Sequence, residues 1–297
     1  MIPFNNLPSN VKVDWFMEPT ITSEVHEWTK PVGCNYVYMI AVGGGGWGGN
    51  GASGAVGTAR GGGGSGGGGC IATLLVPAFL ITDSLFIRVG AGGNNATGSL
   101  PFNTIISAYR IFSATEDYLN VPSGNNGGPG STSAPGAAAG TSTNSYSNSP
   151  LGTIGKFQTA PTTIAGVIGG AIAGAAGTDY TFINYLSPGA SGAGTTSGDF
   201  AGGSILSAYG QQSAVTVVQG GAAVSGATAG QNDGSSGFWI PKRFAFYGGA
   251  GGGASNTGVG GKGGKGAPGC GGGGGGAGVT GGKGGDGGDG FVVIISY

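Results

Sequence analysis

Residues 260–268 read GGKGGKGAP and residues 281–289 read GGKGGDGGD, so both stretches repeat every third residue. This period differs from the about 3.6 residues of an α-helix and the two of a β-strand, and it is the period of the left-handed polyproline-II-type helix. Every third side chain then lies on one edge of the helix, and the other edges are bare glycine backbone. Because bare edges allow neighbouring backbones to touch, the sequence predicts packed polyglycine-II helices.

Glycine supplies 74 of the 297 residues, and its ordering costs more backbone entropy than that of any other residue. A polyproline-II-type helix has no internal hydrogen bonds, so its N–H and C=O groups must bond laterally to neighbouring segments. Low-complexity glycine chains are often disordered, but disordered chains are poor in apolar residues and rich in charge. Here apolar residues make up 38% and charged residues 8%, which favours an ordered body.

Apolar runs between the glycine stretches indicate β-strands. The run 36–42 enters the glycine-rich body and the run 291–297 leaves it, and we expect these two strands to pair in a small sheet. No window shows amphipathic helical spacing without Gly or Pro, so little or no α-helix is expected. The predicted fold is all-β with packed polyglycine-II helices. The other strand candidates are residues 70–76, 84–89, 104–112, 214–218 and 238–247.

The first 33 residues differ from the remainder of the chain, because they hold four of the 12 acidic residues and the single histidine, His26. We interpret residues 1–33 as an attachment segment, since mixed charges and large aromatic residues are typical of an interface. Residues 34–297 then form a glycine-rich body, with variable loops over about 94–247. The candidate attachment residues are Trp15, Phe16 and Trp28.

The composition argues against several functional classes. The net charge is −1, so no basic surface is expected for nucleic acid. One histidine and three dispersed cysteines leave no evident metal site or catalytic triad, and the glycine runs lack the Lys-Ser/Thr of a phosphate-binding loop. Scattered acids such as Glu116 and Asp117 are interpreted as solvated loop residues rather than as a catalytic pair. We expect no enzyme activity, no cofactor and no metal.

Cysteines, an apolar stretch and the charged glycine arrays have mainly structural interpretations. Cys70 and Cys270 adjoin glycine runs and are expected to be small buried apolar residues. Residues 164–176 have Gly-x-x-x-Gly spacing but are shorter than the ~20 residues of a membrane span, so a packed glycine/alanine layer is expected. No charged region precedes an apolar core at the N-terminus, so no signal peptide is expected.

Lys and Asp share one edge of each three-residue array, and we expect these edges to lie side by side and form ion pairs.

The order of the motifs along the chain adds a resemblance. The motifs are WTKPVG (28–33), YVYMIAVGGGGWGG (36–49), GGGGSGGGGC (61–70), LFIRVGAGG (85–93) and the closing GGKGGDGGDGFVVIISY (281–297). This succession resembles the glycine-rich domains of bacteriophage tail-fibre, tail-tip and spike proteins, over about residues 28–93 and 245–297. It is also similar to phage fibre-tip adhesins, in which packed polyglycine-II helices carry variable receptor-binding loops.

The resemblance implies a non-enzymatic protein at the virion surface, a spike or fibre tip that recognises a host surface glycan or outer-membrane protein. The alternative is a structural capsid or decoration protein without a receptor. Other virion proteins would bind the N-terminal segment, and a homotrimer is one expected form, since cyclic closure protects strand edges. Aromatic residues on glycine- and serine-rich loops suit receptor contacts, although large aromatic residues are also common in cores. The candidate receptor-binding residues, expected at the end far from the paired strands, are Tyr109, Tyr118, Tyr146, Tyr180, Tyr185, Tyr209 and Trp239.

Overall fold

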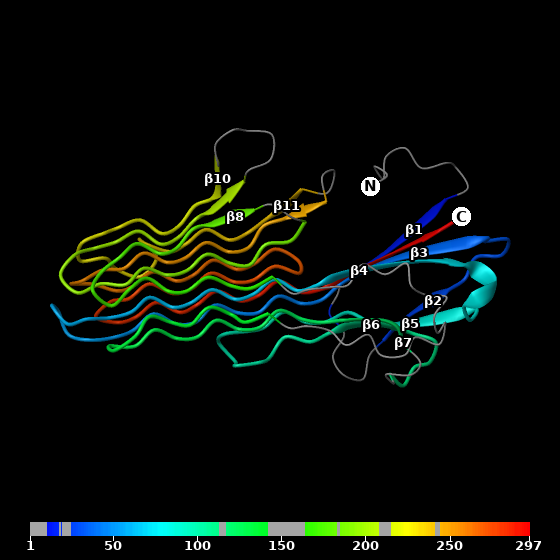
Figure 1. Ribbon diagram of the computed structural model, residues 1–297, viewed down its shortest axis with the longest axis horizontal. Coiled ribbons are helices and arrows are strands. Elements are labelled where there is room, and N and C mark those ends of the chain that lie inside the picture. Colours follow the sequence, from blue (N-terminus) through cyan, green and yellow to red (C-terminus); the bar gives the residue numbers. More distant parts are fainter. Residues whose placement is uncertain are drawn as a thin grey trace.

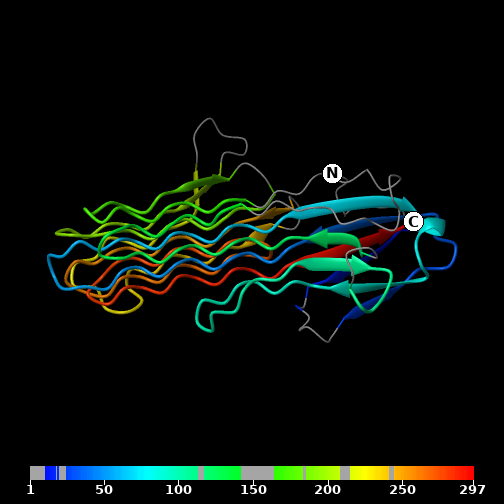
Figure 2. The same ribbon diagram turned by 60° about the horizontal axis from the view of Figure 1, so that its bottom comes forward.

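The computed structural model describes residues 11–17, 19, 25–112, 117–141, 164–182, 185–207, 215–240 and 244–297. The two larger β-sheets lie at one end of the long axis, and glycine-rich segments run along this axis toward the other end (Figure 1). The turned view in Figure 2 shows the same division. The strands are β1 (Lys12–Phe16), β2 (His26–Thr29), β3 (Tyr36–Val42), β4 (Ile71–Pro77), β5 (Ser84–Arg88), β6 (Thr104–Ser107), β7 (Asp117–Val121), β8 (Tyr180–Phe182), β9 (Ile205–Ser207), β10 (Val215–Val218), β11 (Trp239–Ile240), β12 (Ala245–Phe246) and β13 (Phe291–Ser296).

Strand β13 lies between β1 and β3 and pairs antiparallel with both, in a sheet of order β1-β13-β3-β4. Its register with β3 places Phe291 opposite Val42 and Ser296 opposite Val37. All residues of β13 are buried, which explains the continuous apolar sequence FVVIIS where a half-exposed strand would alternate. Strands β3 and β13 therefore lie side by side.

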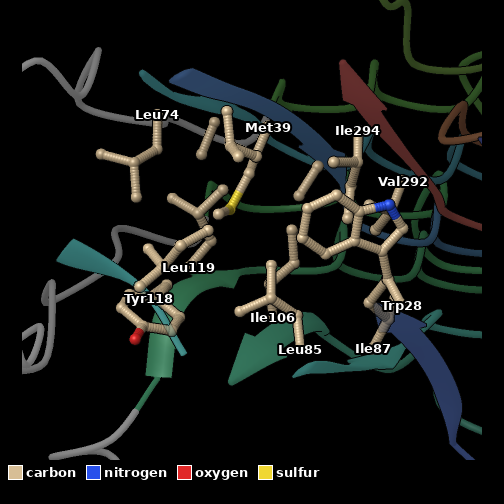
Figure 3. Packing of buried hydrophobic residues seen from close by; sticks show 14 of the residues in the cluster. Trp28, Met39, Leu74, Leu85, Ile87, Ile106, Tyr118, Leu119, Val292 and Ile294 are labelled. Carbon is tan, nitrogen blue, oxygen red and sulfur yellow. The ribbon is translucent and has the colours of Figure 1, made fainter. Parts of the chain in front are cut away.

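The second sheet has the order β2-β5-β6-β7, and its apolar side chains share a core with those of the first sheet. In this core Trp28 of β2 and Leu85 of β5 pack with Met39 of β3 and Ile294 of β13 (Figure 3). The intervening residues of β3 and β13, such as Phe291, point to the opposite face, because side chains alternate along a strand. There they form a second core with Leu186, Phe246 and Ala267, which joins the sheet to the glycine-rich body.

The described part of the N-terminal segment is built into these sheets. β1 pairs with β13, and β2 pairs with β5, so residues 12–16 and 26–29 are strands of different sheets. The boundary expected at residue 33 therefore does not coincide with a division of the fold. Charge density changes there, whereas antiparallel pairing joins strands that lie far apart in the sequence.

Residues 270–278, called the central segment below, show how the glycine-rich segments are joined. From Gly271 to Gly278, the N–H group of each successive residue points to a different neighbouring segment, and every third residue returns to the same one. Gly271 and Gly274, for example, donate to the carbonyl groups of Ser187 and Ala190 at 3.2 and 2.9 Å. The hydrogen bonds of this segment thus run sideways, and their partners repeat every three residues.

From Cys270 to Ala277, the carbonyl groups follow the same rule and accept from three further segments. Gly63 N–H donates to Gly275 C=O at 2.8 Å, and Gly66 N–H donates to Gly272 C=O at 2.9 Å. The central segment is therefore enclosed by six neighbours, and its backbone groups are satisfied without a sheet ladder. These neighbours are residues 46–52, 63–66, 187–193, 249–255, 261–264 and 282–288.

The close approach of these segments explains why they consist of glycine. A Cβ atom at Gly249 would lie 1.8 Å from the carbonyl oxygen of Gly264, and one at Gly192 would lie 1.9 Å from that of Gly275. Real Cβ contacts are essentially never shorter than 3.0 Å, so any side chain would push the segments apart. The composition follows from the distance between the backbones.

The described residues contain no α-helix, and a short 3₁₀ turn at Ala78–Leu80 is their helical element. No helix in this part of the chain has the length and apolar character of a membrane span. The apolar stretch 164–176 instead lies among the glycine-rich segments, where Ile164 pairs with Gly68 and Gly166 N–H donates to Ala139 C=O at 3.0 Å. The observed fold is thus nearly all β, as the sequence predicts.

Candidate functional site

The glycine-rich segments reverse direction at a group of turns at the end of the body far from the two larger sheets (Figures 1 and 2). Bridges and hydrogen bonds place these turns side by side: Ser53 pairs with Gly278, Arg60 pairs with Thr195, and Gly226 N–H donates to Thr257 Oγ1 at 2.9 Å. We call them the distal turns. They comprise residues 53–59, 131–134, 171–174, 195–199, 224–230, 256–258 and 278–280.

The distal turns present small and hydroxyl side chains. Alanine, serine, threonine and glycine predominate, and none of these turns contains an aromatic residue. Val56 and Val279 are their exposed large apolar side chains, with 57% and 42% of their surface accessible. Because long side chains are few, the backbone of the turns determines the shape of this surface. The glycine-rich segments that lead into the turns hold this backbone in place.

The candidate receptor-binding residues do not gather at the distal turns. Tyr109 is exposed just beyond β6 of the second sheet, and Tyr118 of β7 is buried in the core between the sheets. Tyr185 is 48% exposed and packs edge-on against Phe244, whose ring belongs to the second core. Tyr146 and Tyr209 lie outside the described residues.

Tyr180 and Trp239, the other two candidates, lie on short strands beside the glycine-rich body. Tyr180 begins β8 and is half-buried against an apolar cluster that contains Phe182. Burial raises the pKa of the Tyr180 phenol above its usual value. These two side chains are parts of packed clusters, and aromatic type alone did not identify a common surface.

Trp239 and Trp15, which the sequence analysis assigned to opposite roles, belong to one aromatic cluster. Their ring centroids lie 6.3 Å apart, and Trp239 stacks on Phe246 at 5.5 Å. Trp15 stacks on Phe291 of β13 at 6.1 Å and keeps 38% of its surface exposed. The cluster therefore ties β1 and β11 to the second core.

The other attachment candidates differ in their exposure. Trp28 is buried, and its Nε1–H donates to Asp14 Oδ2 at 2.8 Å, so the indole serves the core between the sheets. Phe16 is partly buried and packs against His26 at 5.5 Å. Of these three residues, Trp15 is the one that offers a large exposed surface.

The two aspartates of the second glycine array bind backbone N–H groups rather than lysine. The two arrays do lie side by side, since Gly263 N–H donates to Lys283 C=O at 2.9 Å. However, Asp289 Oδ1 accepts from Gly92 N–H and Asp286 Oδ1 accepts from Asn95 N–H, both at 2.8 Å. The ion pairs of the described residues are Lys12–Asp14 and Lys30–Asp83, so the expected pairing between the arrays is not among them. These Asp carboxylates accept backbone hydrogen bonds of the kind that carbonyl groups of neighbouring segments accept elsewhere in the glycine-rich body.

The three cysteines form no disulfide, and Cys70 and Cys270 are buried. Burial raises the pKa of each of these two thiols to about 12, which keeps them protonated and unreactive at neutral pH. No cluster of potential metal ligands occurs among the described residues.

Arg60 is a residue that the sequence analysis did not single out. It follows directly on the distal turn 53–59 and is fully buried. The signal in the sequence was its isolation, since it is the single charged residue between Lys30 and Asp83. A lone cation before a run of glycines marks a position where the backbone supplies the acceptors.

No protein-family model matches this chain, and no curated protein shows significant sequence similarity to it.

Proposed function

We propose that the glycine-rich segments are polyglycine-II helices. The support is the hydrogen-bond pattern of the central segment, in which donors and acceptors rotate through six neighbours with a period of three residues. Such a helix has three residues per turn and no internal hydrogen bonds, so lateral bonding of this kind satisfies its backbone.

We further propose that the protein is a non-enzymatic phage virion protein, a spike or fibre tip whose distal turns recognise the host cell surface. The observation that carries this proposal is the position of the distal turns, which lie together at one end while the larger sheets lie at the other (Figure 1). Backbone packing in the body does not depend on turn side chains, so the turns can vary without loss of the scaffold. The receptor is a surface glycan or an outer-membrane protein.

The opposite end is the proposed attachment surface for other virion proteins. Trp15 and Val32 are the exposed large apolar residues of the described N-terminal segment, and Val32 is fully exposed. Interfaces of this kind use apolar residues surrounded by polar ones, and the exposed Lys12, paired with the half-buried Asp14, lies near Trp15 on β1. Attachment as a homotrimer remains part of this proposal, and the mass of the purified protein in solution tests it.

A binding experiment with matched surface variants tests the host-recognition proposal. Purified protein should bind susceptible cells and block infection, and Val56→Asp should abolish both effects because it places a charge on the distal turns. Leu100→Asp is the control, since Leu100 is as exposed as Val56 but lies outside the distal turns, in the loop that precedes β6. Both variants should keep the melting temperature of the wild type, because neither side chain is buried.

Failure of the wild-type protein to bind cells or block infection would contradict host recognition. That result, together with incorporation of the protein into particles, would favour the alternative of a structural capsid or decoration protein. Equal loss of binding in the Val56→Asp and Leu100→Asp variants would instead show that the contact surface is not confined to the distal turns.

A further inference from the structure

Arg60 is a fully buried cation whose hydrogen-bond partners are all neutral. Its Nε–H donates to Thr58 C=O at 3.1 Å, and Nη1–H donates to Gly54 C=O at 3.3 Å. Its Nη2–H donates to the backbone carbonyl of Asn256 at 3.0 Å and to the side-chain Oδ1 of the same residue. Burial of a charge is costly unless hydrogen bonds compensate, and guanidinium can compensate here because it carries five donors in a fixed plane.

The partners of Arg60 belong to two different distal turns. Gly54 and Thr58 lie in the turn 53–59, and Asn256 begins the turn 256–258. Asn256 Oδ1 also accepts from Gly57 N–H at 3.1 Å, so the amide closes a bridge between the two turns. One side chain therefore fixes both turns from beneath.

A third distal turn joins the same network through the backbone. Arg60 N–H donates to Thr195 C=O, and Thr195 N–H donates to Arg60 C=O, both at 2.8 Å. At the other end of the turn 195–199, Asp199 Oδ1 accepts from Asn256 N–H at 2.7 Å. These hydrogen bonds and the chain of the turn 195–199 thus form a closed path from Arg60 through Thr195, Asp199 and Asn256 back to Arg60.

This network compensates for the weak intrinsic order of the turns. The turn 53–59 reads SGAVGTA and exposes Val56 and Thr58, and its own side chains bury little apolar surface. Such a turn would lose conformational entropy on binding a partner. A turn that is already fixed avoids this loss, and preorganisation of this kind raises affinity without a new contact.

We propose that Arg60 is the positioning residue of the distal contact surface, which holds the turns 53–59, 195–199 and 256–258 in the conformation that binds the host. This inference rests on the proposed function, because it assumes that the distal turns make the contact. Arg60 itself is buried and does not touch the partner. Its effect on binding passes through Asn256 and the turn 53–59.

The test compares Arg60→Lys with Asn256→Ala in the full-length protein. Lysine keeps the charge but cannot present planar donors to both turns, and Asn256→Ala removes the acceptor while leaving Arg60 in place. Hydrogen–deuterium exchange should become about tenfold faster or more at residues 53–59 and 256–258, whereas exchange of the central segment should stay unchanged. Affinity for susceptible cells should fall by about tenfold, the ratio that corresponds to about 1.4 kcal/mol. Arg88→Lys in β5 is the control, and it should alter neither the exchange of the distal turns nor binding.

The outcomes separate this inference from the function on which it rests. Unchanged exchange at the distal turns in both variants would overturn the role of Arg60, whatever the binding result. Faster exchange with wild-type affinity would show that the network orders turns that do not make the contact, which also overturns the proposal. If the wild-type protein itself does not bind cells, the proposed function fails, and with it the role of Arg60 in binding.

Discussion

Substitution of Gly274 by alanine should measure how strongly the glycine-rich body depends on backbone contact. Gly274 lies in the central segment, and a Cβ atom there would stand 2.0 Å from the carbonyl oxygen of Gly63. Since real Cβ contacts stay beyond 3.0 Å, the segment that contains Gly63 must move by about 1 Å. That segment is held on both sides, so the movement breaks hydrogen bonds rather than filling empty space.

The cost follows from the bonds that Gly63 makes. Its N–H donates to Gly275 C=O at 2.8 Å, and its C=O accepts from Gly192 N–H at 3.0 Å. Loss of both bonds costs about 1–3 kcal/mol in total, and overpacking adds about 1–3 kcal/mol. Alanine restricts the unfolded chain and offsets roughly 0.4–1 kcal/mol. The net loss in the free energy of unfolding should therefore be about 2–5 kcal/mol, or roughly 4–10 °C in melting temperature at about 2 °C per kcal/mol.

Gly140→Ala provides the matched control for this measurement. A Cβ atom at Gly140 would meet just Asn125 Nδ2 at 3.7 Å, which is an ordinary contact, and Gly140 lacks a positive φ. Differential scanning calorimetry and urea denaturation should place this variant at or slightly above the wild type. A Gly274→Ala variant whose melting temperature lies within about 1 °C of the Gly140→Ala variant would refute the argument from backbone contact.

Further predictions concern the cysteines and the tryptophans. At pH 8 iodoacetamide should modify the half-buried Cys34 in the native protein and all three cysteines after denaturation, because burial keeps the Cys70 and Cys270 thiols protonated. A native protein in which all three cysteines label at pH 8 would contradict the burial of these thiols. Folding raises the pKa of both buried thiols to about 12. Their contribution to the free energy of unfolding should therefore be complete at neutral pH and decline as the pH rises toward that value. Trp28→Ala should lower the free energy of unfolding by about 3–5 kcal/mol, and Trp15→Ala by clearly less, since Trp28 is buried and Trp15 is 38% exposed. Equal losses in urea denaturation would show that Trp28 does not support the core as described.

The sequence by itself determined the classes of local structure. The period of three residues, the apolar runs and the scarcity of helix signals predicted an all-β chain, and the described residues contain no α-helix. The apolar run 291–297 indicated a strand, and its lack of alternation is typical of the buried strand that β13 forms. These features are local, because periodicity and apolar character are carried by neighbouring residues.

The tertiary structure decided which side chains are buried and which lie together. Both β1 and β2 are edge strands, but Trp28 of β2 lies in the core between the two sheets while Trp15 of β1 keeps 38% of its surface exposed. The aromatic residues predicted to bind a receptor lie in different parts of the structure. Their sequence could not show this, because the composition of a loop does not say at which end of the molecule the loop lies. Arg60 was missed because three of its side-chain hydrogen bonds go to backbone carbonyls, which every residue possesses.

The partners of the glycine-rich segments could not be predicted either. The central segment bonds to residues 46–52 and 63–66, more than 200 positions earlier in the chain. A bare glycine edge carries no side chain that would distinguish one partner from another. The lengths of the segments, the turns between them and the pairing of β3 with β13 set which edges meet, and those choices exist only in the folded chain.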